Sequence, residues 1–214
     1  MPTILTRARL LASAALAAAA ALPTAALAHH VMEGKRPETV LQGLLSGLGH
    51  PVIGPDHLAF IIAIGIASAL VPAGLAVPAG FVVASALGVM AHLSALPVPM
   101  VELLVALTVV AAGALLYSGA ALGRGFWTLV AVGGGLLHGY ALAETIIGAE
   151  RGVLGAYVAG IAIVSFALAA CAHALARVLS GPLGGRHPRV RMAGAALGCV
   201  GVALAVLALV PGVP

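Results

Sequence analysis

The chain of 214 residues is 62% hydrophobic and only 7% charged, with a formal net charge of +4. A soluble domain carries roughly 25% charged residues, so this chain has too few charges to cover a water-exposed surface. The composition excludes a soluble enzyme, a nucleic-acid-binding domain and a disordered chain. It predicts an all-α integral membrane protein that contacts lipid and no nucleic acid.

Residues 1–28 have the three parts of a cleavable signal peptide. Arg7 and Arg9 precede an apolar stretch over 10–22, and Ala26-Leu27-Ala28 is an A-x-A-like cleavage site. The apolar stretch is short for a span, which needs ~20 residues. We therefore predict cleavage rather than an uncleaved first transmembrane helix.

The rest of the chain, residues 29–214, is predicted to form a single transmembrane helical domain with about six spans. A short apolar stretch at 38–49 comes first. It is too short to cross ~30 Å of hydrocarbon and predicts a re-entrant or interfacial half-helix. Six longer apolar segments follow, at roughly 57–75, 77–96, 99–121, 125–148, 152–179 and 191–211.

The distribution of basic residues predicts the orientation. Arg124 precedes the fourth span, and the loop at 181–191 before the sixth span is the most basic stretch of the mature chain. The positive-inside rule places both loops in the cytoplasm. We predict an N-out, C-out protein of the bacterial inner (cytoplasmic) membrane, with its mature N-terminus in the periplasm.

The segment from His50 to His57 is the first candidate site. It holds two histidines and Asp56, the only aspartate of the chain. Pro51, Gly54 and Pro55 are expected to prevent a regular helix between the histidines. Irregular backbone at membrane depth occurs where it lines a cavity or is buried in protein. Imidazole and carboxylate suit a divalent transition metal. Alternatively, Asp56 only caps the following helix.

The second candidate site lies in the fourth span, where His138 precedes Glu144 by six residues. His138 is near the midplane by count, where ionisable groups are costly and usually functional. Glu144 would lie about 120° round a regular helix from His138. The two can share a cavity only if several helices line it. The alternative is that His138 hydrogen-bonds a neighbouring helix.

The predicted topology places seven ionisable residues between the outer interface and the midplane, as a cation path opening outward requires: His50, Asp56, His57, His92, Glu102, His138 and Glu144. The candidate metal ligands are His50, Asp56, His57, His92, His138 and Glu144, with Glu102, His29 and His30 as weaker candidates.

The segments HPVIGPDHL and HGYALAE resemble those of the HupE/UreJ family of bacterial membrane proteins, whose first motif is H-x5-D-H. The signal peptide and the six spans are similar too. The resemblance implies a nickel or cobalt permease without an ATPase subunit, in which His50, Asp56, His57, His138 and Glu144 line the path. Leu142 occupies the place where many relatives carry a further histidine.

The sequence thus predicts a secondary transporter that imports Ni2+ or Co2+, with Zn2+ as another candidate ion. We expect no enzymatic activity and no permanently bound cofactor. A homo-oligomer and a functional link to hydrogenase or urease are left open. One alternative is an intramembrane zinc-dependent hydrolase, although the chain has no HExxH motif. Another is a non-transporting accessory protein or metal sensor for hydrogenase or urease maturation.

Overall fold

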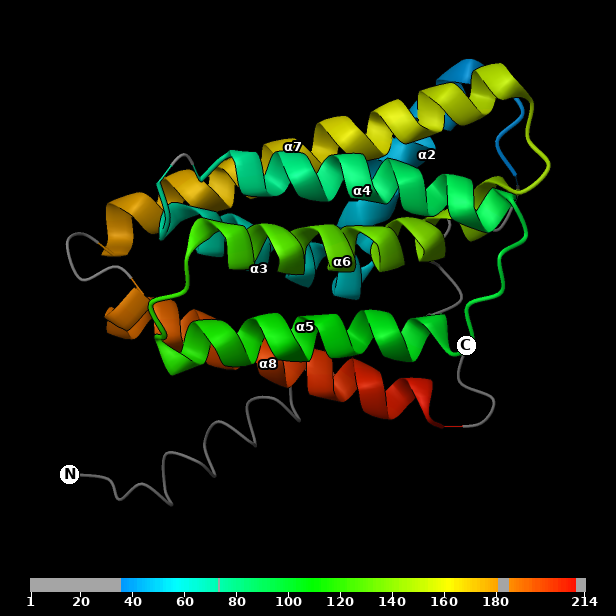
Figure 1. Ribbon diagram of the computed structural model, residues 1–214. Helices are drawn as coiled ribbons and strands as arrows, with labels where there is room; N and C mark the ends of the chain where they lie inside the picture. The colour runs from blue at the N-terminus through cyan, green and yellow to red at the C-terminus, as the bar shows by residue number, and fades with distance from the viewer. Residues whose placement is uncertain (1–35, 73, 181–184, 211–214) are drawn as a thin grey trace.

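The computed structural model describes residues 36–72, 74–180 and 185–210. These residues form an all-α bundle without strands, which confirms the predicted fold class (Figure 1). The predicted signal peptide, His29 and His30 lie outside the described residues. The helices are α2 (Val40–Ile53), α3 (Pro55–Ala69), α4 (Ala76–Leu93), α5 (Val101–Ser118), α6 (Arg124–Leu142), the 3-10 helix η2 (Ala143–Ile146), α7 (Arg151–Ser180) and α8 (Pro188–Ala208).

Five segments of the described chain are long and apolar enough to cross a membrane, one in each of α4 to α8. Helices α2 and α3 meet this criterion only as a pair, which bends by 77° at the break between them. By length and composition, the described residues therefore hold five spans, or six if the bent pair counts as one. The chain is a multi-pass membrane protein.

The start of the bundle differs from the prediction. The expected first span at 57–75 is the shorter α3, which ends at Ala69, and the expected half-helix at 38–49 is α2, which continues to Ile53. Pro51 lies inside α2, and only Gly54 leaves the helical conformation, with φ −72° and ψ 109°. Pro55 is accommodated because it opens α3, where a missing N–H leaves no helical hydrogen bond unmade.

The start of α6, which carries Arg124, and the start of α8 with the described residues 185–187 before it lie at the same end of the bundle, on the left in Figure 1. Gly119 approaches Gly185 there, and the Arg191 Nε donates to the Tyr117 carbonyl oxygen over 2.8 Å. The loops that follow α4 and η2 lie at the opposite end. The described basic residues of both segments therefore lie at one end of the bundle, and the predicted membrane orientation stays a prediction.

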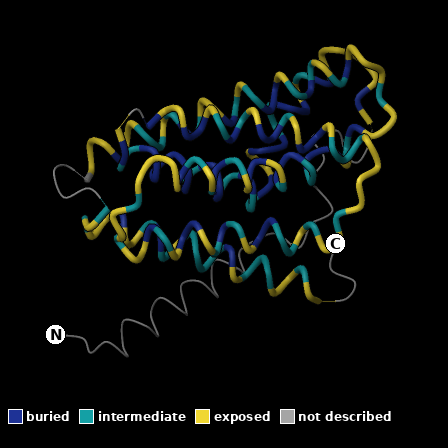
Figure 2. The backbone as a smooth tube through the Cα atoms, viewed as in Figure 1, coloured by how far each residue is buried: buried dark blue, intermediate teal, exposed yellow. Residues whose placement is uncertain are grey.

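Glycines set the closest helix pairs, which are α4 with α6, α5 with α8, and α2 with α7. A Cβ added to Gly47 of α2 would meet the backbone of Tyr157 in α7, and one added to Gly139 of α6 would meet the backbone of Ser85 in α4. Small residues let helices approach closely where lipid offers no hydrophobic driving force. Exposed residues lie along the outer faces of the helices (Figure 2), and large apolar residues such as Val178 are among the exposed ones.

Candidate metal-binding site

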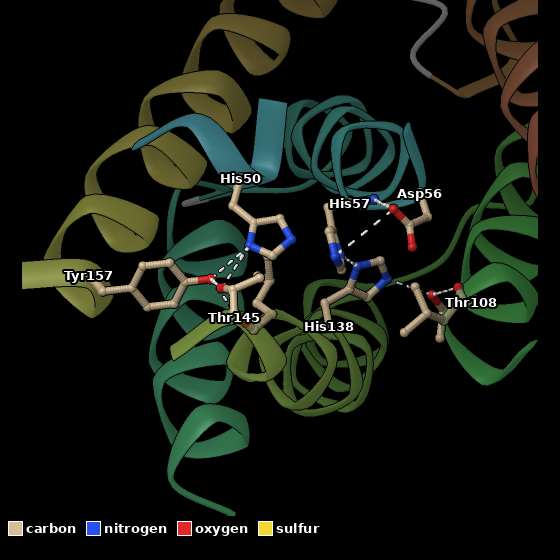
Figure 3. Close-up of polar contacts among 9 residues, drawn as sticks. His50, Asp56, His57, Thr108, His138, Thr145 and Tyr157 are labelled. Carbon is tan, nitrogen blue, oxygen red and sulfur yellow. Dashed lines mark hydrogen bonds and ion pairs between the residues drawn. The ribbon is translucent and has the colours of Figure 1, made fainter. Parts of the chain in front are cut away.

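Three histidines from three helices form a buried row inside the bundle (Figure 3). His50 comes from α2, His57 from α3 and His138 from α6. Their exposed fractions are 6%, 5% and 0%, respectively. The ring centroids of His50 and His57 are 5.8 Å apart, and those of His57 and His138 are 5.1 Å apart. The structure thus joins the two candidate sites that the sequence analysis identified.

The α2–α3 junction places two of these histidines. Thr39 and Gln42 form a capping box at the start of α2, whose last turn carries His50. The Gly54 N–H still donates to the His50 carbonyl oxygen over 3.0 Å, and α3 then begins at Pro55 in a new direction. His57 therefore lies in the first turn of α3, close to the end of α2.

Asp56 lies beside His57 and is partly buried. Its Oδ1 accepts the backbone N–H of His57 over 2.8 Å and lies 3.9 Å from Nε2 of the same residue. The N-cap of α3 is Gly54 and this helix has no side-chain cap, so the structure does not bear out the capping alternative for Asp56. Its carboxylate lies in the first turn of α3, where a negative charge is favourable, and faces the imidazole. Both contacts use the same oxygen atom.

Hydroxyl groups surround His50. The Nδ1 atom of His50 is 2.8 Å from the phenol oxygen of Tyr157 in α7. That phenol donates to the carbonyl oxygen of Leu142 over 2.5 Å, and it accepts the hydroxyl of Thr145 over 3.0 Å. His50 is therefore held by two segments distant in sequence, η2 and α7.

His138 uses both of its ring nitrogens. Its Nδ1 is 2.8 Å from Nδ1 of His57, and its Nε2 is 2.8 Å from Oγ1 of Thr108 in α5. The Thr108 hydroxyl also donates to the Val105 carbonyl oxygen over 2.6 Å. A continuous hydrogen-bonded chain thus runs from α5 through α6 to α3.

Aromatic rings form the apolar wall of the site. Phe60 stacks on His138 with ring centroids 4.5 Å apart, and Phe81 contacts the same imidazole edge-on. Gly134 leaves the space that the Phe60 ring occupies, because a Cβ there would collide with this ring. The wall makes the surroundings of the histidines apolar, so hydrogen bonds to them are stronger than in water.

The structure does not bring the other described candidates into this cluster. The His92 Nδ1 donates to the Tyr140 carbonyl oxygen over 2.8 Å, in a pocket of about 390 Å³ beside the loop that follows α4. Glu144 is exposed on η2, because α6 ends at Leu142 and the chain turns. Glu102 is exposed in the first turn of α5.

The cluster offers imidazole nitrogens and a carboxylate, a donor set that suits Ni2+, Co2+ or Zn2+. As placed in the described part of the chain, no three His, Cys, Asp or Glu side chains converge closely enough to hold one metal ion. Of the predicted ligands, the structure brings together His50, Asp56, His57 and His138. Their role as ligands stays a prediction.

The sequence analysis missed three residues of the cluster: Thr108, Thr145 and Tyr157. A hydroxyl in an apolar span is common and gives little signal by itself. Tyr157 offers the better clue, because a buried tyrosine usually finds a hydrogen-bond partner for its phenol. Its contact with His50 joins residues 107 positions apart, which no local pattern reveals.

The fold and the cluster define a multi-pass helical membrane protein with histidines buried among its helices. The chain belongs to the HupE/UreJ family, because the family model described as HupE / UreJ protein matches residues 16–204. No curated protein matches the chain, and no solved structure does.

Proposed function

We propose that the protein is a secondary transporter that imports Ni2+ or Co2+ across the bacterial inner membrane. The observation that carries this proposal is the burial of His50, His57 and His138 beside Asp56 in a bundle of membrane-spanning helices. Ionisable groups at such depth are costly and mark ion pathways by default. Family membership supports the same role.

The chemistry of the cluster suits transient binding of a divalent ion. Imidazole and carboxylate replace part of the hydration shell, and the ion must be held weakly enough to leave again. The inside-negative membrane potential drives a cation inward by about 2.3 kcal/mol per charge per 100 mV, so roughly twice that for a divalent ion. We therefore assign uptake to the membrane potential, without an ATPase.

The test is uptake of radioactive nickel and cobalt by cells that lack their own high-affinity importers. Wild type is compared with His50→Ala, His57→Ala and His138→Ala at matched membrane levels. We expect uptake by the wild type and its loss in all three variants. His187→Asn is the matched control. His187 caps α8 through its side chain, and Asn keeps an acceptor at that cap.

The outcomes separate the proposed role from its alternatives. Normal membrane levels without uptake of either ion would refute the transporter. Metal binding by the purified protein without flux into vesicles would then favour an accessory protein or a metal sensor serving hydrogenase or urease maturation. Bound Zn2+ together with hydrolysis of a membrane substrate would favour the hydrolase.

A further inference from the structure

We propose that Thr108 and Tyr157 fix which nitrogen of each buried histidine carries the proton. By this inference His50 and His57 present Nε2 to the metal ion, and His138 positions His57 instead of ligating. The inference rests on the proposed function only for the identity of the ion. The proton positions follow from contacts within the protein.

The first chain of contacts begins at a carbonyl group, which can only accept. The 2.6 Å contact between Thr108 Oγ1 and the Val105 carbonyl oxygen therefore requires the hydroxyl proton of Thr108. A hydroxyl has a single proton, so at its 2.8 Å contact with His138 the threonine oxygen accepts. The Nε2 atom of His138 consequently carries a hydrogen.

The consequence passes to His57. In neutral His138, a hydrogen on Nε2 leaves the lone pair on Nδ1. The 2.8 Å contact between the Nδ1 atoms of His138 and His57 then requires a hydrogen on Nδ1 of His57. The lone pair of His57 therefore lies on Nε2. With both nitrogens in hydrogen bonds, His138 orients its neighbour, as second-shell partners of metal-ligating histidines do.

Asp56 places a second potential ligand atom beside this lone pair. The Nε2 atom of His57 lies 3.9 Å from Asp56 Oδ1. This is too long for a hydrogen bond, and both atoms are electron-rich when the histidine is neutral. Metal bonds to imidazole nitrogen and carboxylate oxygen are each about 2.0–2.2 Å, so one ion can contact both atoms.

The second chain of contacts fixes His50 in the same way. The Tyr157 phenol uses its one proton for the Leu142 carbonyl oxygen, at 2.5 Å. Its oxygen therefore accepts from Nδ1 of His50 at 2.8 Å, and the lone pair of neutral His50 lies on Nε2. Figure 3 shows the edge of this imidazole remote from Tyr157 turned toward His57.

The direct test is nitrogen NMR of the full-length, metal-free protein in detergent micelles, with isotope-labelled histidine. Each signal is assigned by substituting the histidine with glutamine. We expect the hydrogen on Nδ1 for His50 and His57, and on Nε2 for His138. The reverse assignment at His57 or His138 would overturn the proposal, whether or not the protein transports metal.

The functional test removes one hydroxyl at a time. Thr108→Val should shift the hydrogen of His138 and weaken Ni2+ binding by the purified protein roughly tenfold or more, as loss of a second-shell partner does. Thr108→Ser keeps the hydroxyl, so both the hydrogen position on His138 and the Ni2+ affinity should equal those of the wild type. Thr128→Val removes a hydroxyl elsewhere in the bundle, near Gly80, and should change neither.

For the second chain, Tyr157→Phe should weaken Ni2+ binding in the same manner. Tyr117→Phe is the control, since Tyr117 is exposed on α5. Wild-type Ni2+ affinity in both Thr108→Val and Tyr157→Phe would overturn the positioning role. Absence of Ni2+ and Co2+ uptake by the wild type would refute the transporter alone, because the NMR assignment stands without it.

Discussion

The contact of Gly139 with α4 allows a sharp test of how closely packing and site geometry are linked. A Cβ at this position would lie 2.0 Å from the carbonyl oxygen of Ser85 and 2.6 Å from its Cα and carbonyl carbon, whereas ordinary contacts begin at 3.4 Å. In Gly139→Ala, α4 and α6 must therefore separate by about 1.4 Å to restore an ordinary contact with that oxygen. Overpacking of this kind costs about 1–3 kcal/mol.

The same displacement reaches the metal site, because His138 is the preceding residue. If α6 takes up the whole shift and moves away from His57, the 2.8 Å contact between His138 and His57 lengthens to about 4.2 Å, which is no longer a hydrogen bond. We therefore expect Gly139→Ala to lose most of its nickel uptake, in addition to its loss of stability.

Gly133→Ala is the matched control on the same helix, because nothing lies within 4 Å of a Cβ added there. Both substitutions raise the helix propensity equally. The difference in stability between the two variants therefore measures the steric collision alone. For a protein of this size, about 1–3 kcal/mol corresponds to a melting temperature roughly 2–12 °C lower for Gly139→Ala. Equal melting temperatures in detergent and equal nickel uptake would refute the reasoning.

Three further substitutions test other parts of the site. Phe60→Ala removes the ring stacked on His138 and should cost about 3–5 kcal/mol, whereas Phe126→Ala at an exposed position should change thermal unfolding little; similar losses would contradict this. His92→Ala should retain measurable nickel uptake, because His92 bonds a carbonyl outside the cluster; complete loss would place it on the path. Asp56→Asn keeps a side-chain oxygen that can accept the His57 N–H and removes the charge, so we expect a stable protein with little uptake, and normal uptake would reduce Asp56 to a structural residue of the first turn of α3.

Composition and apolar segment length predicted the helical bundle, because in a membrane the backbone must satisfy its own hydrogen bonds. The predicted topology placed His57 and His138 in the same half of the membrane, and the family resemblance implied that both line one path. The prediction for Glu144 assumed that the helix continues past Leu142. The chain instead forms η2, which leaves Glu144 exposed and brings Thr145 to His50.

Tertiary contacts decide the parts of the site that local patterns cannot predict. Thr108 reaches His138 across 30 residues, and Tyr157 reaches His50 across 107. These contacts depend on the distances between packed helices, and glycines allow the shortest of these distances. The sequence shows that glycines are numerous, but it does not show which helix backbone each one faces.

The break at Gly54 turns the first motif into a site. His50 and His57 are seven residues apart, so a continuous helix would place them on one face about 10.5 Å apart along its axis. The extended backbone of Gly54 and the 77° bend bring their ring centroids to 5.8 Å. A Cβ at Gly54 would lie 2.7 Å from the His57 ring, so the residue that bends the chain also leaves room for the imidazole. The seven-residue spacing therefore brings the two imidazoles together only because the chain bends between them. Neither helix alone could present both imidazoles to one ion.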